Sequence, residues 1–283
     1  MNILVSGSNG QLGNEFKKRV KDSQHQFNFI TRAELDYSNS KDIALKLNEF
    51  KFDLIINCAA YTAVDKAESE PKLAFEINAN SVKALAAYCF DHQKELIHIS
   101  TDFIFDGNCY WPISETQDAN PVSVYGQSKW QGECFVKEYC PKSYIFRTSW
   151  LYSNHGNNFL NTMRRLMKEK DELGVVYDQI GTPTYAGALA EAILLIIDHE
   201  NFKENYGVYN YSNLGVASWY DFAAQIKMFG GFDLQLNAIN TASYPTPAQR
   251  PSYSVLDKSK LQSVFGINIP NWVDALKDCM KLI

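Results

Sequence analysis

The sequence predicts an α/β fold with a doubly wound parallel sheet and a smaller C-terminal lobe. Short apolar segments alternate with helical patterns as far as Thr148. These segments are apolar on both faces, which is typical of parallel strands covered by helices on each side. After Trp150 the alternation loosens. We therefore predict one domain over residues 1–150 and a lobe over residues 151–283, with some segments of the lobe returning to the sheet.

The elements of the first part follow from this alternation. Five strands are predicted, at Asn2–Ser6, Gln26–Thr31, Phe52–Ala60, Glu95–Ser100 and Ser143–Thr148. Four helices are predicted between them, at Gln11–Asp22, Asp42–Phe50, Pro71–Asp91 and Tyr125–Tyr139. A proline suits the first position of a helix, where the backbone N–H has no helical partner, so Pro71 marks a helix start.

The second part carries fewer clear signals. Helical patterns cover Asn157–Lys170 and Thr184–His199, and Gly207–Ser212 reads as a strand. Ser218 and Asp221 have the spacing of a capping box, which predicts a further helix after them. The stretch 241–256 is rich in proline, serine and tyrosine, so we predict an irregular loop that takes part in binding.

The composition is that of an ordinary globular protein and excludes several classes. The chain has 283 residues and a net charge of −5, which gives no basic face for nucleic acid. It lacks an apolar run long enough for a membrane span and a signal peptide at its start, so we expect a cytoplasmic protein. The six cysteines and five histidines show no ligand or redox spacing, so we predict reduced thiols and no metal site.

A glycine-rich turn lies between the first predicted strand and helix. Gly7, Gly10 and Gly13 have the spacing G-x-x-G-x-x-G. Glycines there allow a tight turn and let the backbone approach a pyrophosphate, which the helix N-terminus then binds. In this strand–turn–helix context the pattern predicts a Rossmann-like dinucleotide site that includes Gln11 and Leu12; a plain turn is the alternative.

The residues after the second strand indicate which dinucleotide binds. NAD sites usually have a carboxylate at this point, but here the strand ends in Thr31 and Arg32. Arg32 is suited to a 2′-phosphate, which favours NADPH, with NADH as the alternative and a solvated surface charge as the other reading of Arg32. We expect further cofactor contacts beside the adenine and beneath the ribose and nicotinamide, from Asp36, Tyr37, Ala59, Ala60 and Tyr61.

Three residues predict the chemistry of the site. Tyr125 and Lys129 form a Y-x-x-x-K pair on one face of a helix, within about 6 Å of each other. A free tyrosine has a pKa of about 10, and a nearby ammonium lowers it, so Lys129 is expected to lower the pKa of Tyr125. Thr101 follows the fourth strand, at the sheet edge where ligands bind. Its hydroxyl is placed to donate to the carbonyl that Tyr125 protonates.

These motifs resemble the dTDP-4-dehydrorhamnose reductase family of the extended short-chain dehydrogenase/reductases. The similarity extends over segments 59–68, 100–107, 121–133, 146–152, 156–166, 178–184 and 244–257, which occur in order. It implies reduction of the 4-keto group of dTDP-4-dehydro-L-rhamnose to dTDP-L-rhamnose, a polysaccharide precursor. On this resemblance Tyr125 is the general acid, Lys129 tunes it, and Thr101 polarises the carbonyl.

The resemblance also implies the residues that bind the sugar nucleotide. Asp102 and Trp150 are expected to contact it, although a tryptophan after a buried strand is often part of a core. Phe103 stands where the family has tyrosine, so one polar contact to substrate is expected to be missing. Arg250, between prolines of the late loop, is a bidentate donor suited to a diphosphate, with a structural salt bridge as the alternative.

Some members of the family form a dimer around a magnesium ion held by glutamates. Glu15 and Glu191 match two of these positions, but no glutamate near the C-terminus matches the third. We therefore predict no metal, expect Glu15 to be an exposed acid, and leave a homodimer open.

Two other functions remain as alternatives. A nucleotide-sugar dehydratase of the same superfamily commonly has an acid at the position of Phe103, and an epimerase holds NAD tightly, which Arg32 disfavours. The second alternative is a non-catalytic NADP-binding relative that serves as a regulatory subunit of methionine adenosyltransferase. The presence of Thr101, Tyr125 and Lys129 disfavours it.

Overall fold

The computed structural model describes all 283 residues, and its centre is a six-stranded sheet whose strands all run parallel. The spatial order is β10-β5-β4-β3-β1-β2. The order reverses between β1 and β3, which is the point where doubly wound sheets bind ligands. This confirms the predicted α/β class. The strands are β1 Asn2–Ser6, β2 Gln26–Phe29, β3 Leu54–Asn57, β4 Glu95–Thr101, β5 Ser143–Thr148 and β10 Gly207–Asn210.

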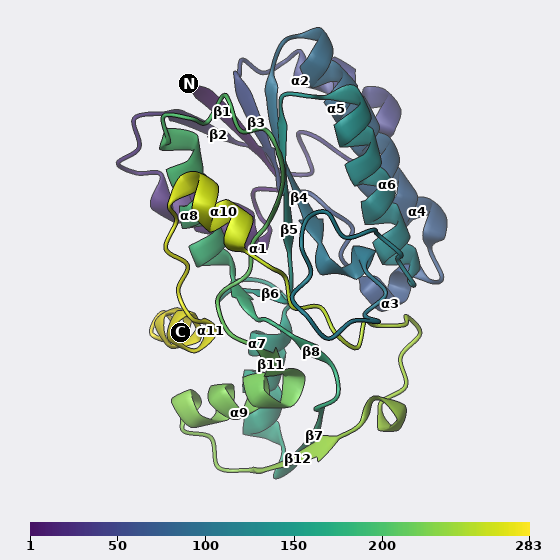
Figure 1. Cartoon of the computed structure of the whole chain (residues 1–283), viewed down its shortest axis with the longest axis vertical. Helices are drawn as coiled ribbons and strands as arrows, with labels where there is room; N and C mark the ends of the chain where they lie inside the picture. Colours follow the sequence, from purple (N-terminus) through teal and green to yellow (C-terminus); the bar gives the residue numbers. More distant parts are fainter.

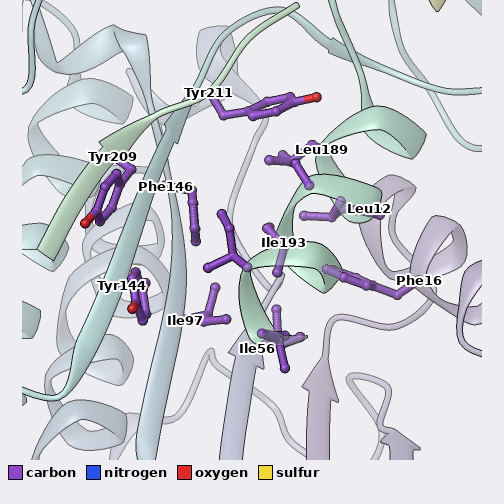
Figure 2. Close-up of a cluster of buried hydrophobic side chains, with 14 of the residues drawn as sticks. Leu12, Phe16, Ile56, Ile97, Tyr144, Phe146, Leu189, Ile193, Tyr209 and Tyr211 are labelled. Carbon is purple, nitrogen blue, oxygen red and sulfur yellow. The ribbon is translucent and has the colours of Figure 1, made fainter. Parts of the chain in front are cut away.

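Helices cover both faces of the sheet (Figure 1). One face is covered by α1 (Gln11–Arg19), α8 (Ala186–Asp198) and α10 (Ser259–Phe265). Figure 2 shows this core, with Leu189 and Ile193 of α8 packed toward the sheet. The other face is covered by α2 (Ile43–Leu47), α5 (Ser81–Asp91) and α6 (Val124–Tyr139), and a short 3-10 turn, Ser40–Asp42, precedes α2.

The segment predicted as one helix over 71–91 is interrupted by a π turn. It consists of α4 (Pro71–Phe75), the π turn Glu76–Asn80 and α5. Asn78 lies in this turn, is fully buried, and bonds both the N–H and the carbonyl of Tyr61, at 2.9 and 3.0 Å. The π turn thus carries the buried Asn78 side chain that holds the loop at Tyr61.

The second lobe has a core of its own, which lies below the sheet in Figure 1. Its parallel strand pair, β7 (Glu172–Val176) and β12 (Gln235–Ile239), was not predicted, because its two strands lie about sixty residues apart in the sequence. The helices of the lobe are α7 (Phe159–Glu169), α9 (Trp219–Gly230) and α11 (Trp272–Met280), joined by the short strands β6 Leu151–Tyr152, β8 Ile180–Gly181, β9 Thr184–Tyr185 and β11 Ala217–Ser218.

Several local predictions of the second part are confirmed. Ser218 and Asp221 form the capping box, with the Ser218 N–H 2.8 Å from the Asp221 carboxylate and the Asp221 N–H 3.0 Å from the Ser218 hydroxyl. The loop 241–256 is irregular apart from one 3-10 turn at Thr241–Ser243 and two isolated β-bridges, of Tyr253 with Ile180 and of Leu256 with Ile113. In the chain as a whole, the six cysteines are free thiols. None of its helices has both the length and the apolar character needed to cross a bilayer.

Candidate active site

A continuous groove runs along the carboxyl ends of the strands. It consists of a hollow of about 270 Å³ and a cleft of about 660 Å³, which share Asn9, Gly10, Cys58, Ala59 and Ala60 in their lining. The shared residues follow β1 and β3, so the groove passes over the switch point of the sheet. Together the two hollows have the size of a site for a cofactor and a second ligand.

The glycines of the cradle are required by close backbone contacts. Gly7 has φ +67°, and a Cβ there would lie 2.7 Å from the backbone nitrogen of Ala59. A Cβ at Gly13 would lie 2.6 Å from Cα of Ser8. Gly10 is the N-cap of α1, and no side chain caps the first N–H groups of the helix. These donors are thus free to bind an anion, and the residues of this turn fit a dinucleotide pyrophosphate.

The smaller hollow is lined by seven of the predicted cofactor residues, among them Arg32, Asp36 and Tyr37. Arg32 has 73% of its side chain exposed, and its Nε donates to Asp36 Oδ1 at 3.2 Å. Tyr37 is buried, with its hydroxyl 2.9 Å from Ser6 Oγ. The Arg32 guanidinium therefore faces solvent at the far end of the groove. The Asp36 carboxylate, in the same loop, holds it in place.

Tyr61 is the one predicted cofactor residue that does not line the groove. Ala59 and Ala60 line both hollows, but Tyr61 is in neither. Its hydroxyl donates to Glu70 at 2.9 Å, and its backbone is held by Asn78. The side chain thus faces the α4 side of the loop rather than the ligand.

Tyr125 is placed in the cleft by the tight packing of the α6 N-terminus. Ser123 caps the helix by accepting from the Gly126 N–H at 3.1 Å. A Cβ at Gly126 would lie 2.2 Å from the Phe103 carbonyl, so only glycine allows this approach to the 3-10 turn Asp102–Ile104. The Phe103 ring meets the Tyr125 ring edge-on, with centroids 5.4 Å apart.

The expected effect of Lys129 on Tyr125 was wrong. Burial raises the pKa of the Tyr125 phenol to about 12 instead of lowering it, with Thr101 acting in the opposite direction and the charge of Asp102 adding to the rise. The Lys129 ammonium is directed elsewhere: its Nζ donates to the Ile99 carbonyl at 2.7 Å. Tyr125 is therefore a protonated phenol at neutral pH, the form a proton donor needs.

Lys129 lies in the same cleft and is only 2% exposed. Burial lowers its pKa to about 8, against an opposing effect of the Glu133 charge. Glu133 is one helical turn further on, and its carboxylate is bonded by the Arg147 guanidinium at 2.8 Å and by Ser100 at 2.6 Å. This buried pair links β5 to α6 and, through Ser100, to β4.

Thr101 and Asp102 line the cleft at the end of β4. The Thr101 hydroxyl donates to Asp102 Oδ1 at 3.1 Å and accepts from the Phe103 N–H at 3.2 Å. Asp102 is 2% exposed, and its Oδ2 has no hydrogen-bond partner. Burial raises the pKa of this carboxyl to about 6. An unpartnered buried oxygen beside a cleft is suited to a hydroxyl-rich ligand.

An aromatic wall forms the side of the cleft contributed by the second lobe. Trp150 has φ +47° and stacks on Trp219, with centroids 3.6 Å apart and rings inclined by 7°. Phe159 also packs against Trp219, with ring centroids 4.7 Å apart. All three line the cleft, so Trp150 faces it and is not only part of a core. Trp219 and Phe159 were missed, because nothing local in their segments signals this contact.

Arg250 lies in the cleft lining and forms an ion pair at the same time. Its Nη1 and Nη2 donate to the two carboxylate oxygens of Asp65 at 2.9 and 2.8 Å. Asp65 belongs to α3 (Val64–Ala67), so the pair fastens the late loop to the first domain. The salt bridge expected as the alternative is present, and the diphosphate contact stays a prediction.

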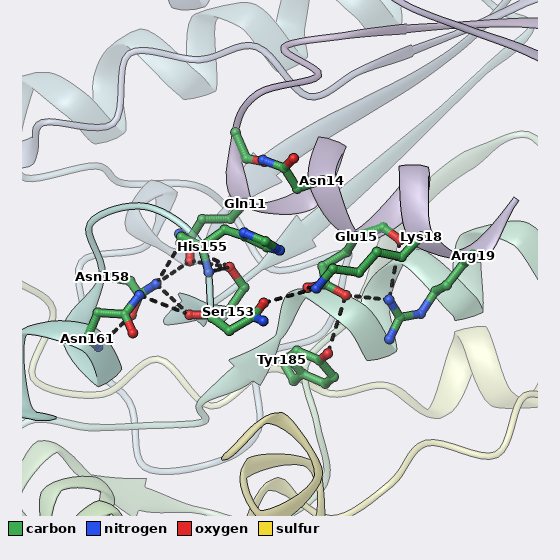
Figure 3. A network of polar contacts seen from close by, with 12 residues as sticks. Gln11, Asn14, Glu15, Lys18, Arg19, Ser153, His155, Asn158, Asn161 and Tyr185 are labelled. Carbon is green, nitrogen blue, oxygen red and sulfur yellow. Dashed lines mark hydrogen bonds and ion pairs between the residues drawn. The ribbon is translucent and has the colours of Figure 1, made fainter. Parts of the chain in front are cut away.

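Gln11 connects the cradle with the second lobe (Figure 3). Its Oε1 accepts from Asn158 at 2.8 Å, and its Nε2 donates to the Leu151 carbonyl at 3.3 Å. Gln11 and Leu12 both line the cleft. The start of α1 is therefore set against the loop that leads into α7.

Comparison with known proteins identifies the family. The model of the RmlD substrate binding domain matches residues 1–283. The chain is 41% identical to the dTDP-4-dehydrorhamnose reductase of Aggregatibacter actinomycetemcomitans, over 98% of this chain and 97% of that protein. The protein belongs to the dTDP-4-dehydrorhamnose reductase family.

Solved structures of the dTDP-4-dehydrorhamnose reductase family have the same fold. A reductase from Clostridium acetobutylicum is 43% identical and superposes with a TM-score of 0.95, covering 100% of this chain and 99% of that chain. A reductase from Bacillus anthracis, solved in complex with NADP, is 35% identical with a TM-score of 0.94 over the same shares of the two chains.

Glu15, one of the two residues matched to the magnesium site of some family members, is not the exposed acid we expected. It is fully buried, because Lys18 at 3.0 Å, Arg19, and the Tyr185 hydroxyl at 3.3 Å surround its carboxylate (Figure 3). Glu191 is exposed on α8. No group of three or more His, Cys, Asp or Glu side chains is arranged to hold a metal.

Proposed function

We propose that this protein uses NADPH to reduce the 4-keto group of dTDP-4-dehydro-L-rhamnose, giving dTDP-L-rhamnose. The observation that carries the proposal is the position of the buried Tyr125 phenol, which lines the same cleft as the dinucleotide cradle and Asp102. Membership of the reductase family supports the substrate, and the NADP complex of the Bacillus anthracis relative supports the cofactor. Such a reaction uses soluble metabolites, in line with a cytoplasmic location.

The chemistry divides between the cofactor and the side chains. NADPH, when bound, supplies a hydride to the carbonyl carbon. The carbonyl oxygen then takes the proton of the Tyr125 hydroxyl, so that C=O becomes CH–OH with one hydride and one proton gained. Because burial keeps that proton on the phenol at neutral pH, Tyr125 is ready to act as the general acid.

The residues around Tyr125 bind and orient the sugar nucleotide. The Asp102 carboxyl has a free oxygen for a sugar hydroxyl, and Thr101 beside it is placed to meet the carbonyl oxygen once its hydroxyl turns from Asp102. The Trp150–Trp219 wall excludes water from one side. Arg250 supplies positive charge for the diphosphate. Holding the reacting groups in place in this way accounts for much of the rate of such reactions.

The structure also bears on the alternative functions. A dehydratase needs an acid to protonate the leaving hydroxyl, and position 103 offers only a phenyl ring packed on Tyr125. A non-catalytic subunit has no need for a buried, unpartnered carboxyl beside a phenol, since such groups cost stability. Both observations favour a reductase.

Tyr125→Phe tests the proposal directly. We expect kcat for NADPH oxidation with dTDP-4-dehydrorhamnose to fall by about 100- to 10,000-fold, the range for loss of a general acid. NADPH affinity, measured by titration of its fluorescence, should change little. Tyr110→Phe is the matched control, because Tyr110 is 86% exposed and outside the groove. Retained activity in Tyr125→Phe would reject Tyr125 as the proton donor.

Arg32→Ala tests the choice of cofactor. The exposed guanidinium at the end of the groove is expected to bind the 2′-phosphate, which NADH lacks. KM for NADPH should therefore rise by about 10- to 100-fold, the value of a charge-assisted contact of roughly 1.5–3 kcal/mol. KM for NADH should stay within about twofold. Equal increases for both cofactors would contradict the assignment of Arg32.

A further inference from the structure

Gln179 is a buried polar residue that lies behind the aromatic wall of the cleft. It directly precedes β8, is 7% exposed, and lines neither of the two hollows. Its Oε1 is 3.1 Å from Nε1 of Trp219, and its Nε2 is 3.1 Å from Oγ1 of Thr241. One end of the amide is therefore bonded to the wall, and the other end is bonded to the first residue of the late loop, residues 241–256.

The directions of these hydrogen bonds follow from the indole. An indole nitrogen only donates, so the amide oxygen of Gln179 must face Trp219 and the amide nitrogen must face Thr241. The Thr241 hydroxyl accepts from that nitrogen and donates its own hydrogen to Asp178 Oδ1 at 2.7 Å. The Thr241 backbone N–H donates to the same oxygen at 2.8 Å. Every side-chain donor thus points the same way, from Trp219 to the Asp178 carboxylate, so that each bond polarises the next.

The strand that follows Gln179 supports the second indole of the wall. A Cβ at Gly181 in β8 would lie 2.7 Å from Cε2 of Trp150, so the Trp150 ring packs directly on the backbone of this strand. Trp150 in turn stacks on Trp219 at 3.6 Å. One indole is therefore held by contact with Gly181, and the other is held by a hydrogen bond from two residues earlier in the chain.

The same short segment also holds the far end of the late loop. Ile180 donates its N–H to the Ser252 carbonyl and accepts from the Ser254 N–H, each at 2.8 Å. Thr241, at the start of the loop, is held by the chain of hydrogen bonds described above. The late loop, which contains Arg250, is thus joined at both ends to the segment that supports the wall.

We propose that Gln179 is a positioning residue, which fixes the Trp219 indole and ties it to Thr241, so that the aromatic wall and the late loop form one binding surface for the sugar nucleotide. The inference rests on the proposed function, which supplies the sugar nucleotide as the ligand of this surface. Because Gln179 lies behind the wall, it acts on the ligand only through its two partners. Its loss should weaken binding in the ground state and the transition state alike, which raises KM and leaves kcat unchanged.

Gln179→Leu tests the inference, because leucine is of similar size and bonds neither Trp219 nor Thr241. KM for dTDP-4-dehydrorhamnose should rise by about 3- to 10-fold, the equivalent of one neutral hydrogen bond. kcat and KM for NADPH should stay within about twofold of the wild-type values. Gln117→Leu is the matched control, because Gln117 is exposed and outside the groove.

The indole N–H of Trp219 gives a readout that needs no turnover. The chain has five tryptophans, so nuclear magnetic resonance of the isotope-labelled protein resolves few indole N–H signals, and Trp219→Phe assigns the one that belongs to Trp219. In wild type this hydrogen is bonded to Gln179 and should exchange slowly with water. In Gln179→Leu it should exchange at least about 10-fold faster, because its acceptor is gone.

Two substitutions of Thr241 separate the loop from the wall. Thr241→Ser keeps the hydroxyl between Gln179 and Asp178 and should behave as wild type. Thr241→Val removes the hydroxyl, so KM for the dTDP-sugar should rise while the Trp219 N–H stays bonded and exchanges slowly. Thr241 is exposed, so this pair decides the point even if circular dichroism shows that Gln179→Leu does not fold.

The inference is overturned if the Trp219 N–H exchanges equally slowly in wild type and Gln179→Leu, or if KM for the sugar nucleotide does not change. A merely structural role for Gln179 would raise both KM values or lower kcat, and this result also overturns it. Absence of turnover in wild type would instead reject the proposed function, and the exchange measurement would still show whether Gln179 positions the wall.

Discussion

Three ionisable side chains of the cleft share one property. Tyr125, Lys129 and Asp102 are all buried, and burial shifts the pKa of each toward its uncharged form. None of them has the full set of partners that a charged group in a protein interior requires. Such groups lower stability, and they are typical of sites where protons move. The site is therefore expected to gain stability when these residues are neutralised, and to lose activity.

Asp102→Asn tests, through the pH dependence of stability, how much the buried Asp102 carboxylate destabilises the fold. The pKa of Asp102 is about 6 in the folded protein against 3.8 in an ordinary aspartate, so between these values the folded state binds more protons than the unfolded state. Its contribution to stability therefore falls as pH rises from 3.8 to about 6 and stays low above it. The variant should be more stable at pH 7 by roughly 1–3 kcal/mol.

Urea unfolding at several pH values between 4 and 7 measures this difference. The gap between variant and wild type should widen as pH rises to about 6 and then stay constant. A gap that does not depend on pH would show that Asp102 is not the group responsible.

At the residue scale, the sequence was informative where chemistry follows from local spacing. Tyr125 and Lys129 share a helix face, and Thr101 ends a strand, so their place in the cleft could be predicted. The direction of the Tyr125 pKa could not, because it depends on burial by distant segments. Trp219 was missed for the same reason, since its partner Trp150 lies far away in the sequence.

At the scale of elements, α6 is the part of the fold that aligns the site. Its N-terminus approaches the turn after β4 at Gly126, and its middle approaches the π turn at Gly132, where a Cβ would lie 2.2 Å from the Asn78 carbonyl. Ser128, between the two glycines, accepts from the Asn78 amide at 3.0 Å. The helix is thus fixed at two points on either side of Lys129.

Gly132→Ala tests whether this close packing outweighs the higher helix propensity of alanine. Alanine in the middle of a helix ordinarily stabilises by about 1 kcal/mol relative to glycine. Here we expect destabilisation by about 1–3 kcal/mol, because the new methyl group meets backbone that cannot move without shifting the helix. Chemical denaturation measures it, and Gln131→Ala, at an exposed position of the same helix, should stay within about 0.5 kcal/mol. A stabilised Gly132→Ala would show that α6 can move away from the π turn.

The elements that were predicted correctly are those with strong local patterns. All five strands of the first part were located, and α6 was expected to begin within one residue of its observed start. The π turn was not anticipated, because the sequence over 71–91 is continuously helical in pattern, and the contacts of Asn78 with Tyr61 and Gly132 are made to other segments of the chain. The pair β7 and β12 was missed because strand pairing across the lobe leaves no local mark.

At the scale of the whole molecule, the two parts of the chain are interleaved. Strand β10 joins the edge of the sheet beside β5, and α8 and α10 cover one of its faces, although all three come after residue 150. Segments after residue 150 therefore return to the sheet, and they supply many of the side chains of the core in Figure 2.

Residues 1–150 produced alone test whether the first domain is autonomous. The fragment lacks β10, α8 and α10, so only α1 is left to cover that face of the sheet, and much of the face is exposed to water. We expect no cooperative thermal transition by circular dichroism and strong binding of a hydrophobic dye, as in loosely packed states. A monomeric fragment with a sharp transition would show that the cover from the second part is dispensable.

The stacked indoles of Trp150 and Trp219 form a native spectroscopic probe of the position of the lobe relative to the sheet. One indole follows β5 and the other begins α9, so the pair spans the junction between the sheet and the lobe. Parallel chromophores at such short range couple their excited states, and the sign and size of the resulting ultraviolet couplet depend on the angle between them. Any rocking of the lobe over the cleft during turnover is therefore recorded by two native residues, without an attached label.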